Sequence, residues 1–229
     1  MTLIVAVVCP EGIVIAADSK RTHQKQVSNP LTGQTEIMDS GFTATADKII
    51  LSDNNVAIAI QGDVMVNGQG AWVYLQEFIN RNPGLNVTDF AKELGAELFS
   101  VKDKGDMRIF IAGYEKSGGD NSPQLFELNT KEKTLCDFQD EFPIARWIGE
   151  VDIMNRIFDP YCIAKAPSYA FPYQAYTLQS AVDYAILGIE TTIRVMALQD
   201  RPQTVGFPID VLLIKPDGVQ WLQKKEVHV

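Results

Sequence analysis

The order of its elements predicts that this chain has an α+β fold, in which helices cover two stacked, mainly antiparallel β-sheets. Apolar runs separated by short turns dominate the first 60 residues, which is typical of strands. Helical periodicity follows, and then come further strands, two more helices and a final pair of strands. Elements in this order suit two facing sheets with helices on both outer faces.

The first part of the chain consists of predicted strands joined by turns. Four apolar runs predict strands at residues 2–8, 13–20, 48–51 and 56–63. A Pro-Glu-Gly turn separates the first two strands. Between the second and the third, an enlarged hairpin is predicted over residues 23–42, because this segment contains the turn formers Asn29, Pro30, Thr32 and Gly33.

Helices and further strands are predicted beyond residue 63. The first helix stops at Asn82 and has one apolar face, made of Ala71, Trp72, Leu75, Phe78 and Ile79. The second begins at Thr88 and directs inward Phe90, Leu94, Leu98 and Val101. Strands are predicted at 108–114, 124–128, 134–138, 209–214 and 219–222. Two more helices are predicted at 151–158 and 177–198, with a loop rich in proline and aromatic residues at 159–176. The longest helix has one stripe to bury, formed by Val182, Ile186, Ile189, Ile193 and Met196.

Length and charge limit the classes of function. With 229 residues, of which 46% are hydrophobic, the chain can bury a sizeable core, and no linker or repeat divides it. We therefore expect one domain over residues 1–229. The net charge of −9 argues against a nucleic-acid partner and against a polybasic membrane-surface module. The opening apolar run is too short to span a bilayer and has no basic segment before it, so neither a transmembrane helix nor a signal peptide is expected.

Cysteines and histidines narrow the chemistry further. Cys9, Cys136 and Cys162 are odd in number and form no CxxC motif, which indicates reduced thiols in a cytoplasmic protein. The two histidines, His23 and His228, lie far apart in the sequence. Neither a histidine metal cluster nor a Ser-His-Asp triad is easily assembled from them, and no metal or organic cofactor is expected.

Thr2 is the residue with the most distinctive chemistry. Initiator methionine is generally removed when the next residue is as small as threonine, and Thr2 would then carry a hydroxyl and a free α-amine. The amine titrates near roughly 7.7–8.0, so a useful fraction is neutral and can accept the hydroxyl proton. A nucleophile with its own base would result. The plain alternative is that Thr2 is only the first residue of a strand.

The neighbouring segments favour the catalytic interpretation. Residues 2–20, 46–51 and 56–63 resemble the N-terminal portion of proteasome β subunits and of HslV, which are N-terminal-nucleophile (Ntn) hydrolases. The resemblance implies a four-layer αββα sandwich, the Ntn-hydrolase fold. It also implies four site residues: Thr2 as the nucleophile, Asp18 as the acidic partner, Lys48 as the site lysine and Gly62 as the oxyanion-hole glycine. The Lys48–Gly62 interval matches the family spacing, whereas the Asp18–Lys48 interval is longer because of the enlarged hairpin.

Each of these residues also has a physical reason to be there. An ammonium on Lys48 near Thr2 would lower the pKa of the amine and stabilise negative charge on the hydroxyl. Asp18 would keep Lys48 charged and fix its orientation. A glycine at position 62 lets the backbone approach a substrate carbonyl, and losing such an oxyanion donor typically costs ~2.7–4 kcal/mol. Taken singly, the three could be a strand-end acid, a surface lysine and a turn glycine.

The C-terminal half resembles the family more loosely. Glu150 stands where proteasome β subunits carry an accessory serine, and 148–150 and 205–210 are similar to the Anbu-type bacterial relatives. Asp200 matches the second acidic residue of the family's site, and Thr204 is the nearest candidate for the second accessory serine. Structural interpretations stay open for the two acids: Glu150 as an acid at a helix N-terminus, and Asp200 as a polar residue just past a helix.

The resemblance implies a threonine-type peptidase. It would cleave peptide bonds through an acyl-enzyme and act on peptides or unfolded proteins. A homo-oligomeric ring or helical assembly, with an unfoldase as a possible partner, is a family expectation. An apolar specificity pocket with Val64 and Met65 in its wall is also expected.

Two alternatives remain. One is a different Ntn enzyme, a small-molecule amidase or a peptide ligase. The other is a non-catalytic scaffold subunit like proteasome α subunits, although those carry a helical extension before the first strand.

Overall fold

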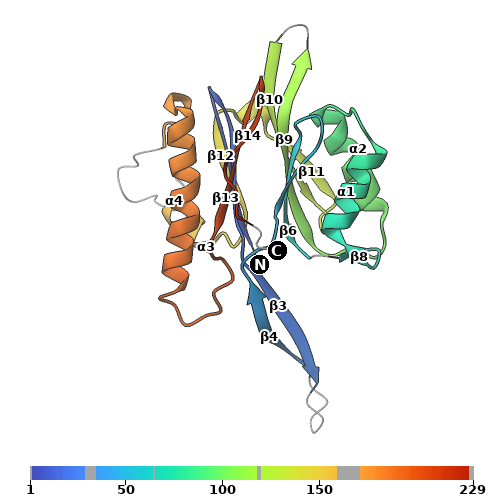
Figure 1. The fold of residues 1–229 in the computed structure, drawn as a ribbon, viewed down its shortest axis with the longest axis vertical. Helices are drawn as coiled ribbons and strands as arrows, with labels where there is room; N and C mark the ends of the chain where they lie inside the picture. The colour runs from blue at the N-terminus through green and yellow to red at the C-terminus, as the bar shows by residue number, and fades with distance from the viewer. Residues whose placement is uncertain (1, 29–34, 64, 118–119, 159–170, 227–229) are drawn as a thin grey trace.

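The protein is a sandwich of four layers, as Figure 1 shows. The structure is a computed structural model and describes residues 2–28, 35–63, 65–117, 120–158 and 171–226. Two five-stranded antiparallel sheets face each other, and helices lie on both outer faces. The predicted fold class, an αββα sandwich, is confirmed.

The first sheet contains the first two and the last two strands of the chain, together with β12. Its strands, in spatial order, are β12 (Ile144–Gly149), β1 (Leu3–Cys9), β2 (Gly12–Asp18), β13 (Ile209–Lys215) and β14 (Gly218–Gln223). All seven residues of β1 and all seven of β2 are buried, because core lies on both faces of this sheet. The register sets Leu3 opposite Gly149 and Asp18 opposite Ile209, so the start of β1 and the end of β2 lie at one end of the sheet.

The second sheet supplies the other wall of the central core. In spatial order it consists of β11 (Thr134–Asp137), β10 (Asp120–Asn129), β9 (Met107–Ser117), β6 (Ala57–Gly62) and β5 (Ile49–Leu51). Between the sheets lies an apolar cluster to which both contribute, including Ile4, Ala6, Ile15, Ala59, Phe110 and Leu125. This cluster sets the distance between the two sheets, and therefore the width of any site at their ends.

Two helices cover each outer face. The helices α1 (Ala71–Arg81) and α2 (Val87–Ser100) pack on the second sheet. On the first sheet lie α3 (Asp152–Ile157) and α4 (Leu178–Met196). The predicted stripe of α4 faces this sheet, since Val182, Ile189, Ile193 and Met196 are buried and Ile186 is partly buried. Two short 3-10 turns occur at Gln139–Glu141 and Tyr173–Ala175.

Two small hairpins complete the fold. The predicted enlarged hairpin is present as β3 (Arg21–Ser28) and β4 (Thr35–Thr43), which pair with each other and project from the end of the sandwich (Figure 1). Its predicted turn formers lie outside the described residues. A second, minimal hairpin joins β7 (Met65–Val66) to β8 (Gln69–Gly70) ahead of α1.

The structure corrects the predicted elements in several places: β7 and β8 were not predicted, and β9 and β10 are longer than the predicted strands at 108–114 and 124–128. The strand β12 was not predicted; it lies at an edge of the first sheet, and of its six residues only Ala145 and Ile148 are buried. The second helix begins at Val87 rather than Thr88, because the side chain of Asn86 accepts a hydrogen bond from the Asp89 N–H and caps it. Most of the predicted loop at 159–176 lies outside the described residues. Among the helices that the structure describes, none is long and apolar enough to cross a membrane.

Candidate active site

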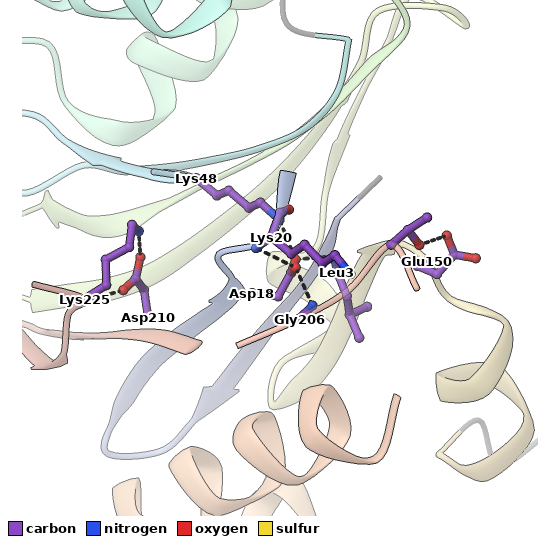
Figure 2. A network of polar contacts seen from close by, with 9 residues as sticks. Leu3, Asp18, Lys20, Lys48, Glu150, Gly206, Asp210 and Lys225 are labelled. Carbon is purple, nitrogen blue, oxygen red and sulfur yellow. Dashed lines mark hydrogen bonds and ion pairs between the residues drawn. The ribbon is translucent and has the colours of Figure 1, made fainter. Parts of the chain in front are cut away.

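Asp18 is the centre of a buried polar network at the end of β2. Its Oδ1 accepts hydrogen bonds from the Leu3 N–H at 3.0 Å and from the Lys48 ammonium at 2.6 Å. Its Oδ2 accepts from the N–H groups of Lys20 at 3.1 Å and Gly206 at 3.0 Å. Figure 2 shows these four donors converging on one carboxylate. With no exposed surface, the charge of Asp18 is compensated entirely by the protein.

Lys48 reaches this carboxylate from the second sheet. It immediately precedes β5, and its Nζ donates to Asp18 Oδ1 and to the Lys20 carbonyl at 2.7 Å. The side chain is 6% exposed, and burial lowers the pKa of Lys48 below its ordinary value, although the charge of Asp18 acts in the opposite direction. The ion pair therefore bridges the two sheets, with an ammonium that loses its proton more readily than a surface lysine does.

Thr2 is held at the same place through its backbone. It is buried and directly precedes Leu3, whose N–H donates to the same Asp18 oxygen as Lys48. The Thr2 carbonyl accepts from the Glu150 N–H at 2.8 Å. Alternation along β1 puts Thr2 on the side of Ile4, which faces the second sheet. The Thr2 backbone is thus anchored on both sides of β1.

Gly149 permits the close approach of β12 to Thr2. Its φ is +102°, and a Cβ at this position would lie 1.8 Å from the Thr2 carbonyl oxygen. No side chain can occupy that space without moving the backbone, so glycine is required there.

Gly62 ends β6 next to the lysine. The Ile60 N–H donates to the Lys48 carbonyl at 2.9 Å, so the last residues of β6 run beside the chain that carries Lys48. Gly62 has a φ of +113°, and a Cβ there would lie 2.1 Å from the Asp106 carbonyl oxygen. Because N–H groups on one edge of a strand recur every second residue, the N–H of Gly62 is expected on the Lys48 side.

Glu150 and Thr204 contact each other. The Thr204 hydroxyl donates to Glu150 Oε2 at 3.0 Å, and the guanidinium of Arg201 lies 3.3 Å from Glu150 Oε1. Arg201 also pairs with Asp152 at 3.1 Å. The Glu150 N–H links Glu150 and Thr204 to Thr2, which fits a role in the site. The ion pair with Arg201 also gives Glu150 a structural role.

The remaining predicted positions are less closely connected. Asp200 is exposed, and within the described part of the chain no hydrogen bond or ion pair joins it to the Asp18–Lys48 pair. Met65 is 50% exposed, and Val64 lies outside the described residues. In the described ranges, no group of three or more His, Cys, Asp and Glu side chains is placed to hold a metal ion.

Comparison with solved structures agrees with this geometry. An Anbu (Gly-1) mutant from Hyphomicrobium sp. strain MC1 matches with a TM-score of 0.64 at 18% identity, over 98% of this chain and 86% of that one. Anbu (ancestral beta-subunit) from Yersinia bercovieri matches with a TM-score of 0.58 at 16% identity, over 98% of this chain and 88% of that one. The chain has the Anbu-like, proteasome β type of Ntn-hydrolase fold. No protein-family model matches the sequence, and no curated protein matches it.

Within this Ntn fold, several neighbours of the site were not predicted from the sequence. Gly206 and Lys20 contribute backbone groups to the network, and a second buried ion pair joins Lys225 to Asp210. The sequence does indicate the segment around Gly206, because residues 205–210 are similar to Anbu-type proteins. No pattern in the sequence indicates Lys225.

Proposed function

We propose that the protein is a threonine-type amide hydrolase that cleaves peptide bonds, with Thr2 as the nucleophile once Met1 is removed. One observation carries the proposal: a single oxygen of Asp18 accepts hydrogen bonds from both the Leu3 N–H and the Lys48 ammonium. The ion pair is thereby attached to the residue next to Thr2. An ammonium so placed favours a neutral α-amine and stabilises a developing alkoxide.

In the proposed reaction, the Thr2 hydroxyl oxygen attacks the carbonyl carbon of a peptide bond. Its proton passes to the Thr2 α-amine, directly or through a water molecule. The C–N bond then breaks, the leaving amine takes that proton, and an ester joins the acyl group to Thr2. A water molecule attacks the ester, releases the carboxylic acid and restores the hydroxyl.

Gly62 has the proposed role of holding the oxyanion. Its N–H is expected on the Lys48 side of β6, and its lack of a side chain leaves the backbone open to a substrate carbonyl. Asp18 and Lys48 supply the electrostatics. Glu150 and Thr204 would border the site beside Thr2. The supporting role of Asp200 rests on the resemblance alone, since Asp200 is exposed and no hydrogen bond or ion pair joins it to the Asp18–Lys48 pair among the described residues.

Substrate and assembly follow from the resemblance. Unfolded protein or peptides are the proposed substrates, and a homo-oligomeric ring or helical assembly in the cytoplasm would enclose the site. The Yersinia protein is described as an ancestral beta-subunit, which supports assembly from several copies. An unfoldase is a possible partner, and no cofactor is required by the proposed chemistry.

The first test is the intact mass of the purified protein before and after incubation with a peptide epoxyketone. This electrophile forms a stable ring only with a hydroxyl and a free amine on one N-terminal residue. We expect loss of Met1 and one adduct at Thr2. The matched control, Thr2→Val, keeps the size of the side chain and removes the hydroxyl, so it should gain no adduct. A mass that retains Met1 and gains no adduct would exclude the proposed hydrolase and favour a scaffold subunit.

A second assay separates the two enzymatic alternatives. A peptidase should degrade an unfolded protein such as casein into many fragments, and Thr2→Val should not. Turnover of a single small amide without degradation of casein would instead indicate a small-molecule amidase.

A further inference from the structure

A second buried ion pair lies beside the Asp18–Lys48 pair. Asp210 on β13 accepts a hydrogen bond from the backbone N–H of Lys225 at 2.8 Å and also pairs with the Lys225 ammonium. The two side chains are 4% and 2% exposed. Figure 2 shows both ion pairs together, and the register of β13 and β2 places Asp210 opposite Ala17, the residue before Asp18.

Lys225 also reaches the chain that carries Lys48. Its Nζ lies 2.9 Å from Oδ1 of Asp47, the residue directly before Lys48. Asp210 belongs to the first sheet, whereas Asp47 leads into β5 of the second sheet. The Lys225 ammonium therefore joins the two sheets directly before Lys48, by contacting Asp210 and Asp47.

We propose that Lys225 is a positioning residue of the active site: anchored on Asp210, its ammonium holds Asp47 and thereby fixes the backbone from which Lys48 extends to Asp18. The inference rests on the proposed function, because Lys48 matters to catalysis only if Thr2 is the nucleophile. A shift of ~1 Å in a positioned group can cost a hundredfold in rate, so an anchor at this point is consequential.

The charges that face Lys48 agree with this arrangement. Burial is the largest influence and lowers the pKa of Lys48, Asp18 and Asp210 raise it, and the ammonium of Lys225 lowers it. Removing the charge of Lys225 would leave the carboxylate of Asp210 unpaired. Both changes favour the protonated form of Lys48, so its pKa should rise.

The first test asks whether the charge of Lys225 faces Lys48, by an NMR titration of the lysine side-chain signals in the full chain. In Lys225→Met we expect the midpoint of Lys48 to move up, because a positive charge that faces it is lost. The matched control is Lys224→Met, since Lys224 is the preceding residue, of the same type, and exposed. An unchanged Lys48 midpoint in folded Lys225→Met, or an equal shift in Lys224→Met, would overturn the proposal.

A second variant covers the case in which Lys225→Met does not fold. Asp47→Ala removes the carboxylate that Lys225 holds, keeps the Lys225–Asp210 pair, and alters a side chain that is 42% exposed. We expect its rate of epoxyketone addition to fall about tenfold. We also expect the Lys48 ammonium to exchange its protons roughly threefold faster or more. The matched control is Asp53→Ala, an exposed position just beyond β5, and it should change neither rate.

The two readouts separate this inference from the proposed function. If the wild-type protein forms no adduct, the hydrolase proposal fails, while proton exchange at Lys48 in Asp47→Ala still decides whether Lys225 holds that backbone. If the wild-type protein forms an adduct and Asp47→Ala matches it in both rates, the positioning role is wrong and the hydrolase stands.

Discussion

At the scale of single residues, Asp18 shows how one carboxylate can organise a site. A buried charge is tolerated only when hydrogen-bond donors replace its hydration, and Asp18 receives four donors from four segments of the chain. Three of the four are backbone N–H groups: that of Leu3 belongs to β1, and those of Lys20 and Gly206 lie in the segments just after β2 and just before β13. The position of the Lys48 ammonium is therefore determined by the backbone rather than by flexible side chains.

The tight contact at Gly149 gives a prediction about stability. We expect Gly149→Ala to lower the free energy of unfolding by at least ~3 kcal/mol, because its Cβ would overlap the Thr2 carbonyl oxygen and displace the end of β12. Urea denaturation measures this. The control Gly218→Ala also has a positive φ, +155°, but no atom lies within 4 Å of its added Cβ. It should cost only ~1–2 kcal/mol, and equal losses would contradict the steric reason.

The lowered pKa of Lys48 predicts a pH profile for Thr2. The rate of epoxyketone addition should rise as the Thr2 amine loses its proton, near roughly 7.7–8.0 or below. It should fall again as the Lys48 ammonium is lost, at a pH below the ordinary lysine value of 10.5. In Lys48→Arg the guanidinium stays protonated, so the alkaline fall should disappear even if the maximum is lower. If the rate falls at alkaline pH in both the wild type and Lys48→Arg, the fall is caused by a group other than Lys48.

At the scale of elements, strands and helices with a large buried face were predicted from the sequence, and a half-buried strand was not. The continuous apolar runs of β1 and β2 revealed strands buried on both faces, and the stripe of α4 revealed its inner face. The edge strand β12 was missed, because a half-buried strand that includes Arg146 has a weaker pattern.

The same reasoning applies to the site. Asp18, Lys48 and Gly62 stand at strand ends where local sequence and resemblance could identify them. Lys225 could not be found, because its contacts with Asp210 and Asp47 are made only by the folded chain.

The N-terminus of α4 allows an element-scale prediction. The Thr177 hydroxyl accepts a hydrogen bond from the Ser180 N–H and caps the helix. We expect Thr177→Ala to lower the free energy of unfolding by about 1 kcal/mol. Thr177→Ser should be nearly as stable as the wild type, because serine supplies the same oxygen. Thermal or urea unfolding of the two variants tests this. Equal stability of the alanine and serine variants would mean that water replaces the cap.

At the scale of the whole molecule, apolar packing and ion pairs have separate roles. Three apolar clusters, one between the sheets and one under the helices of each outer face, supply most of the stabilisation, because removing apolar surface from water is the dominant favourable term in folding. The two buried ion pairs add little net stability, since desolvation offsets their attraction. Their effect is to specify how the sheets meet at the end where Thr2 lies.

This division predicts how stability responds to salt. The side chains of the Asp18–Lys48 and Asp210–Lys225 pairs are at most 6% exposed, so dissolved ions screen them weakly. The net charge of −9, in contrast, acts mainly across the surface, and salt weakens that repulsion. The free energy of unfolding in urea should therefore stay constant or rise by up to ~1 kcal/mol between 0.05 and about 0.5 M sodium chloride. Sodium sulfate is unsuitable here, because it also strengthens apolar burial. A fall of more than ~1 kcal/mol would mean that water and ions reach the pairs between the sheets, and that the end of the sandwich is open in solution.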